Sequence, residues 1–207
     1  MLDLMPFLER PDGCRLYYEV HGDPAREPIV LLDELGVPSA NVYGQSFGGM
    51  VAQELALAHP ERVRTLILAA THCGGRHAVR SEARSPKDRP YLALYSEAFA
   101  RAHPEHVVED LRVGSATPQR PHARRRQWEA VQGFDACGRL GELRVPTLVL
   151  HGTEDRLVDP RNARLLAERI PGAELVLLEG AGHVYHSERA EEADRAVLEF
   201  VERRAGG

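Results

Sequence analysis

The chain has 207 residues, a length that fits one domain, or one domain with an insertion, around a substantial hydrophobic core. Its 28% charged and 43% hydrophobic residues exclude general disorder, and a net charge of −5 excludes the basic footprint of a nucleic-acid-binding protein. The composition therefore predicts a small-molecule partner and no nucleic acid.

Apolar runs alternate with helical patterns along much of the chain. The first two predicted strands, 5–9 and 15–20, flank Pro11-Asp12-Gly13, a turn that favours a hairpin. Later runs are apolar at consecutive residues, as in parallel strands that are buried on both faces. These strands are predicted at 41–43, 64–70, 146–151 and 173–178, and helices at 50–59, 161–169 and 191–203. The alternation predicts an α/β fold with a mostly parallel sheet flanked by helices.

The pattern changes between Thr71 and Arg144, where charge-rich segments show helical spacing at 91–102, 106–114 and 122–132. We interpret residues 72–144 as a helical insertion, and residues 1–71 and 145–207 as the α/β core. Within the insertion, Trp128 and Phe134 could form an apolar lid over a substrate or pack in its own core.

A G-x-S-x-G motif at Gly44-Gln45-Ser46-Phe47-Gly48 lies between a predicted strand and a predicted helix. The motif requires this context, because the strand-to-helix turn holds the serine in a strained conformation and the glycines let strand and helix pass closely. Ser46 is therefore a candidate nucleophile.

A serine hydroxyl needs a base to take its proton, and the base needs an orienting acid. Asp155 follows one predicted strand and His183 follows the next, so both lie where open α/β sheets build their sites. Asp159 and His186 are the alternatives to these two residues. Position favours Asp155, and the glycines beside His183 favour that histidine.

The order Ser46, Asp155, His183 and the G-x-S-x-G motif resemble the α/β-hydrolase superfamily, in its small esterase and lactonase-like branch, from about Pro11 to Arg203. The resemblance implies that Ser46 attacks an acyl carbonyl, that His183 carries the proton and that Asp155 holds the imidazole. It also implies an oxyanion donor at the backbone N–H of Phe47, and it makes the insertion a cap over the active site.

The resemblance breaks just before the motif. Members of the superfamily normally follow the first parallel strand with a His-Gly loop, which donates a second oxyanion N–H, and then with a helix, a strand and a further helix. Here Pro28–Leu35 is either a helix ended by Gly36, which we prefer, or it contains a strand at Ile29–Leu32. Only 33–40 would separate that strand from the next, which is too short for a parallel crossover.

We therefore expect an internal deletion that leaves the sheet short of one or two central strands. Loss of one oxyanion donor costs about 2.7–4 kcal/mol, so activity is expected to be weak unless 33–37 or the cap supplies a substitute N–H.

Cysteine usage and the amino terminus bear on location. The cysteines, Cys14, Cys73 and Cys137, are widely separated, which argues against a disulfide framework and fits a reducing cytoplasm. Residues 1–5 show no secretory signal, and no stretch has the length of a membrane span. We expect a soluble, cytoplasmic protein without a membrane partner, whose oligomeric state the sequence leaves open.

These observations predict a serine hydrolase that cleaves a small carboxylic ester or lactone through an acyl-enzyme on Ser46. No H-E-x-x-H or C-x-x-C motif is present, and no metal or cofactor is expected. One alternative is a degenerate hydrolase fold, weak or inactive, that binds a small molecule or another protein. Another is a truncated chain that does not fold stably by itself.

Overall fold

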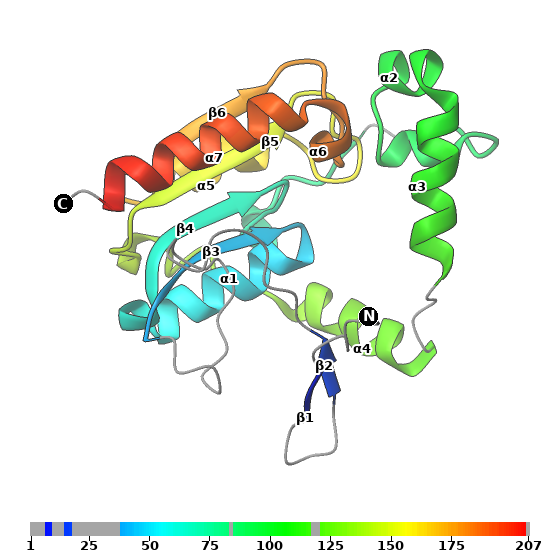
Figure 1. The fold of residues 1–207 in the computed structure, drawn as a ribbon. Coiled ribbons are helices and arrows are strands. Elements are labelled where there is room, and N and C mark those ends of the chain that lie inside the picture. The colour runs from blue at the N-terminus through cyan, green and yellow to red at the C-terminus, as the bar shows by residue number, and fades with distance from the viewer. Residues whose placement is uncertain (1–6, 10–14, 18–37, 83–84, 117–120, 206–207) are drawn as a thin grey trace, which may run out of the picture.

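The computed structural model describes residues 7–9, 15–17, 38–82, 85–116 and 121–205 (Figure 1). Strand β1 (Phe7–Glu9) pairs antiparallel with β2 (Arg15–Tyr17), which confirms the hairpin predicted near the start. The turn at 11–13, the helix-or-strand alternative at Pro28–Leu35 and the possible donors at 33–37 lie outside the described residues.

The central sheet has four parallel strands in the order β3-β4-β5-β6 among the described residues. They are β3 (Ala40–Gln45), β4 (Val63–Ala69), β5 (Thr147–Gly152) and β6 (Glu174–Leu178), close to the four predicted parallel strands. Because neighbouring strands run in the same direction, their carboxyl ends meet at one edge of the sheet. The residues that follow these ends are therefore brought together.

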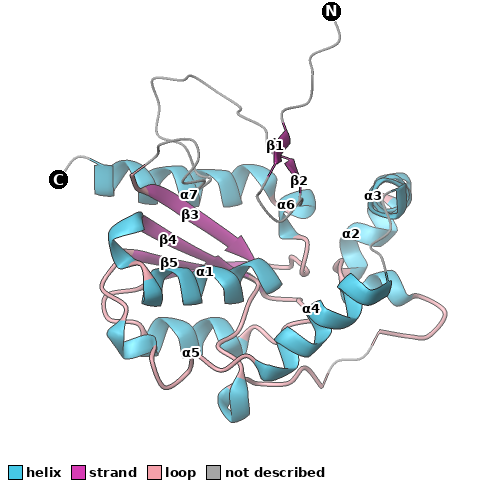
Figure 2. Cartoon of the chain, turned by 90° about the horizontal axis from the view of Figure 1, so that it is seen from below, coloured by secondary structure: helices cyan, strands magenta, loops and turns pink. Residues whose placement is uncertain are grey.

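Helices cover both faces of this sheet (Figure 2). Leu66 and Leu68 of β4 pack in the cluster that contains residues of α1 and α5, whereas Ile67 packs against Phe200 of α7 on the other face. This alternation explains why β4 is apolar at consecutive positions. The covering helices are α1 (Phe47–Ala58), α5 (Arg161–Arg169) and α7 (Ala190–Ala205), all three predicted from the sequence.

The segment between β4 and β5 is helical, and α2 and α3 lie beyond the carboxyl ends of the strands (Figure 1). It contains α2 (Glu97–Ala102), α3 (Pro104–Ala116) and α4 (Pro121–Gly133). The helix predicted at 91–102 is a 3-10 turn (Pro90–Ala93) followed by α2, because Ser96 interrupts it as an N-cap that accepts the Phe99 N–H at 3.2 Å.

None of the helices in the described ranges is long and apolar enough to cross a bilayer.

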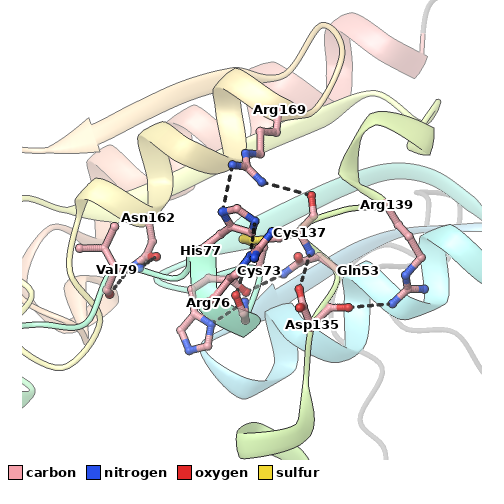
Figure 3. The surroundings of a disulfide bond; sticks show 12 residues. Gln53, Cys73, Arg76, His77, Val79, Asp135, Cys137, Arg139, Asn162 and Arg169 are labelled. Carbon is pink, nitrogen blue, oxygen red and sulfur yellow. Dashed lines mark hydrogen bonds between the residues drawn. A yellow bond between two sulfur atoms is a disulfide. The ribbon is translucent and has the colours of Figure 1, made fainter.

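A disulfide joins the two ends of this helical segment (Figure 3). Cys73 follows β4 and Cys137 follows α4, and their Cα atoms lie 4.9 Å apart across a sequence separation of 64. Main-chain bonds support the approach, including Ala136 N–H to the Cys73 carbonyl at 2.8 Å. The expectation that the cysteines form no disulfide is therefore wrong for this pair, because the fold brings together residues that are remote in sequence.

Candidate active site

Ser46 stands on the turn between β3 and α1. Its φ of 53° lies in the left-handed region, which is rare for a residue other than glycine and is costly enough to mark functional sites. Hydrogen bonds fix this backbone from the neighbouring strand: the Ser46 N–H donates to the Ala69 carbonyl at 2.8 Å, and the Thr71 hydroxyl donates to the Ser46 carbonyl at 2.7 Å. The strand, turn and helix expected around the motif are therefore present.

The glycines of the motif differ in what they contribute. A Cβ on Gly44 would overlap the main chain of Gly48, so strand and helix can cross this closely only with glycine at position 44. A Cβ on Gly49 would come within 2.6 Å of the Thr71 side chain, whereas one on Gly48 would meet open space. The close packing behind Ser46 thus requires Gly44 and Gly49 rather than Gly48.

Ser46 and Phe47 line a cavity of about 810 Å³, a size that suits a small ligand. Phe47 is the first residue of α1, where backbone N–H groups have no partner within the helix. Its N–H is therefore a candidate oxyanion donor. Trp128, on α4, is 62% exposed and lines the same cavity, so it does not pack in a core of the helical segment.

Asp155 and His183 form a buried pair at the carboxyl edge of the sheet. Their side chains come from the loops after β5 and β6, with Nδ1 of His183 2.8 Å from Oδ2 of Asp155, and the residues are 5% and 4% exposed. The carboxylate can only accept, so Nδ1 carries a proton, and Nε2 is the ring nitrogen that is not bonded to Asp155.

A second histidine, His151 at the end of β5, contacts the same carboxylate. Its Nε2 lies 3.0 Å from Oδ2 of Asp155 and 3.0 Å from the Val158 carbonyl, two acceptors that require a proton on this nitrogen. The N–H groups of Leu157 and Val158 donate to the other oxygen, Oδ1, at 2.8 and 2.9 Å. Asp155 is thus held from several directions.

Burial and hydrogen bonding act in opposite directions on the pKa of Asp155. Desolvation acts to raise it, but hydrogen bonds from His151 and His183, together with their charges, more than offset this effect and hold the pKa below its usual range. Asp155 is therefore ionised at neutral pH, as an acid that orients an imidazole must be.

The loop that carries His183 is tied both to the motif and to the helical segment. The Gln45 side chain donates to the His183 carbonyl at 3.0 Å. On the other side, Oε1 of Glu188 accepts the N–H groups of Gly182 and Ser96, each at 3.0 Å, which joins the residue before His183 to the N-cap of α2. The position of the His183 loop is therefore linked to the position of α2.

The structure joins two of the three predicted residues directly and the third only through a neighbour. Asp155 and His183 are hydrogen-bonded, but within the described part of the chain the Ser46 hydroxyl makes no hydrogen bond with His183. Gln45 provides the link. Catalytic hydrogen bonds are often long before substrate binds and shorten in the complex with substrate.

The alternative acid and base are engaged elsewhere. The Asp159 carboxylate binds the Arg161 guanidinium at 2.7 and 2.9 Å, and His186 is exposed and makes no hydrogen bond with Asp155. No group of three or more potential ligands in the described ranges could hold a metal ion.

Sequence reasoning missed Gln45 and His151. A signal existed for each, because Gln45 is the variable residue before the motif serine, and His151 ends the strand four residues before the candidate acid.

Comparisons with known proteins bear on the family and the fold. A family model described as "Serine aminopeptidase, S33" matches residues 33–190, which is more than half of the chain. The crystal structure of a hydrolase from Pseudomonas aeruginosa PA01 superposes with a TM-score of 0.81 and 24% identity, over 97% of this chain and 99% of that one. That likeness concerns the fold, and it shows the same architecture in a chain of similar length.

Two further relatives are longer than this chain. An enol-lactonase from Burkholderia xenovorans LB400 has a TM-score of 0.68 and 26% identity, over 82% of this chain and 68% of its own. A pimeloyl-[acyl-carrier protein] methyl ester esterase from Neisseria meningitidis is 28% identical over 79% of this chain and 69% of its own. The family match, the parallel sheet and these relatives together confirm the predicted resemblance: the chain belongs to the α/β-hydrolase superfamily, within the family described as "Serine aminopeptidase, S33".

Proposed function

We propose that this enzyme is a serine hydrolase that cleaves a small carboxylic ester or lactone through an acyl-enzyme on Ser46. The observation that carries the proposal is the buried Asp155–His183 pair, 2.8 Å apart, at the sheet edge where Ser46 stands on left-handed backbone. The esterase and lactonase names of two relatives support the substrate class.

In the proposed reaction the basic Nε2 of His183 takes the proton of Ser46 as its oxygen attacks the carbonyl carbon. Asp155 stabilises the imidazolium, and the Phe47 N–H donates to the oxyanion. His183 then protonates the leaving alcohol, and a water molecule, activated by the same nitrogen, releases the acid. Residues 72–144 act as a cap on the core formed by 1–71 and 145–207.

The proposed location stays the cytoplasm, but the cysteines no longer support it, since disulfides are typical of oxidising compartments. Fractionation of cells that express the chain at native level would test this location.

Ser46→Ala tests the proposal. We expect it to lower kcat for a para-nitrophenyl ester by roughly a thousandfold or more, because only binding and the oxyanion donor remain. It should also abolish labelling by a fluorophosphonate probe. Ser39→Ala, at a serine outside the site and just before β3, is the matched control and should keep both properties.

The same probe separates turnover from simple binding. If wild-type protein unfolds cooperatively but is neither labelled nor active, the serine-hydrolase mechanism is wrong. The site would then be better described as a binding site on a degenerate hydrolase fold.

A further inference from the structure

Three arginines line the cavity that contains Ser46. Arg76 and Arg80 come from the segment after β4, and Arg156 comes from the loop after β5. We propose that this cavity selects esters or lactones that carry a carboxylate at the end remote from the reacting carbonyl. The inference rests on the proposed function and adds a substrate class to it.

The charge of the cavity is unbalanced. Among the described residues that line it, none is an aspartate or a glutamate. Within the described ranges, the Arg76 side chain hydrogen-bonds to His77 at 3.4 Å, and neither Arg76 nor Arg80 forms an ion pair. Burial lowers the pKa of His72, another lining residue, so this ring stays neutral and adds no charge of its own. Arg76 and Arg80 would therefore meet an anionic ligand without a carboxylate among the described residues that line this cavity.

Arg156 has a carboxylate neighbour, but that neighbour is shared. Glu97 lies 3.8 Å from Arg156, 3.2 Å from Arg89 and 3.3 Å from Arg101. One negative charge cannot neutralise three guanidinium groups, and the Arg156 contact is the longest of the three. With its side chain only 27% exposed, Arg156 is also partly removed from solvent, which strengthens its interaction with a ligand carboxylate.

Apolar side chains also line the cavity, and they indicate the chemistry of the part of the substrate between its two ends. Met50, Trp128, Val131, Leu157 and Val158 line the cavity together with the arginines. The reacting carbonyl must lie at Ser46 and Phe47, so the carboxylate belongs to another part of the molecule. The lining fits a substrate with an ester or lactone group, an apolar middle and an anionic end.

Two esters of similar length test this selectivity. We expect wild-type kcat/KM to be higher for mono-para-nitrophenyl adipate than for para-nitrophenyl hexanoate, and high salt should reduce this ratio. Arg80→Gln and Arg156→Gln should each lower the ratio, by roughly tenfold where a charge-assisted hydrogen bond is lost. Arg164→Gln, an exposed arginine of α5 outside the cavity, makes the same charge change and should keep it. If the ratio of the two kcat/KM values is the same in the wild type, in Arg80→Gln and in Arg156→Gln, the proposal is wrong.

If the chain hydrolyses neither ester, the proposed function is wrong, and a binding experiment still tests whether the cavity binds a carboxylate. Calorimetry with the Ser46→Ala protein compares hexanoate with hexanamide, which differ in charge but little in size. Tighter binding of hexanoate, weakened by Arg80→Gln and retained in Arg164→Gln, would support the carboxylate site. Equal binding of the two ligands, or binding of neither, would refute it.

Discussion

His151 contacts the Asp155 carboxylate, which is also hydrogen-bonded to His183. It is fully buried, and its Nε2 is shared between Asp155 and the Val158 carbonyl. Its other ring nitrogen, Nδ1, has no hydrogen-bond partner in the described structure, which is a cost in a buried position. A polar ring retained at this cost, in contact with the candidate acid, indicates that its hydrogen bond positions Asp155.

Replacement of His151 by phenylalanine is expected to destabilise the fold and to slow ester hydrolysis. The Asp155 carboxylate would lose a buried donor, and hydrogen bonds to charged groups contribute about 1.5–3 kcal/mol. Urea unfolding at neutral pH measures the first effect and the initial rate measures the second. His151→Gln, which keeps a terminal N–H, should recover part of both. A phenylalanine variant as stable and as active as wild type would contradict this role.

Residues of the candidate site could be identified from the sequence only where its chemistry is local. The motif around Ser46 is contiguous, and Asp155 and His183 each follow an apolar strand whose end can be recognised. The contacts of Gln45 and His151 depend on how the loops meet in space, which residue spacing does not contain. The arginines of the cavity were missed for the same reason, since they come from two separate segments.

At the level of elements, the disulfide closes the helical segment onto the sheet. Cys137 follows α4, and its partner Cys73 lies in the segment after β4 (Figure 3). The residues on either side of Cys73, His72 and Gly74, line the cavity that contains Ser46. Both cysteines are buried, and an antiparallel bridge between Gly74 and Asp135 lies beside them. The disulfide therefore ties the chain just after α4, the helix that contains Trp128, to the chain just after β4.

Reduction is expected to destabilise the protein. In the chain-entropy model, opening a loop with a sequence separation of 64 costs about 4 kcal/mol at room temperature. The urea midpoint should fall in dithiothreitol, and the Cys73→Ser/Cys137→Ser double variant should show a low midpoint with or without reductant. A thiol titration of the unfolded chain provides the direct check: of the three cysteines, one should react before reduction and all three after it. Three reactive thiols before reduction would disprove the disulfide.

The elements themselves follow largely from local patterns. Consecutive apolar residues identified β4 and β5, and α5 begins and ends at the predicted residues. The exceptions have local causes: Ser96 caps α2 and separates it from the preceding 3-10 turn, and α3 starts at Pro104, where the first turn tolerates proline. Only the fold reveals that the ends of the helical segment meet.

At the scale of the whole molecule, buried ionisable groups link stability to pH. Because hydrogen bonds hold the pKa of Asp155 below its usual range, its ionised form stabilises the fold above the unfolded pKa of about 3.9. This contribution is lost as the pH falls through the lower, folded pKa. The loss of this stabilisation is therefore confined to strongly acidic solutions.

His72 should govern a separate window at milder pH. Burial alone lowers its pKa, and its Nδ1 accepts the Gly74 N–H at 3.0 Å, which a protonated nitrogen could not do. The unfolded chain therefore takes up this proton first, and stability should decline as the pH falls below about 6.5 towards the folded pKa. Thermal midpoints between pH 7 and pH 5 should fall for wild type and for His122→Gln, an exposed control on α4. His72→Asn, which keeps an acceptor but does not titrate, should flatten the decline, and an unchanged slope in that variant would show that other groups cause it.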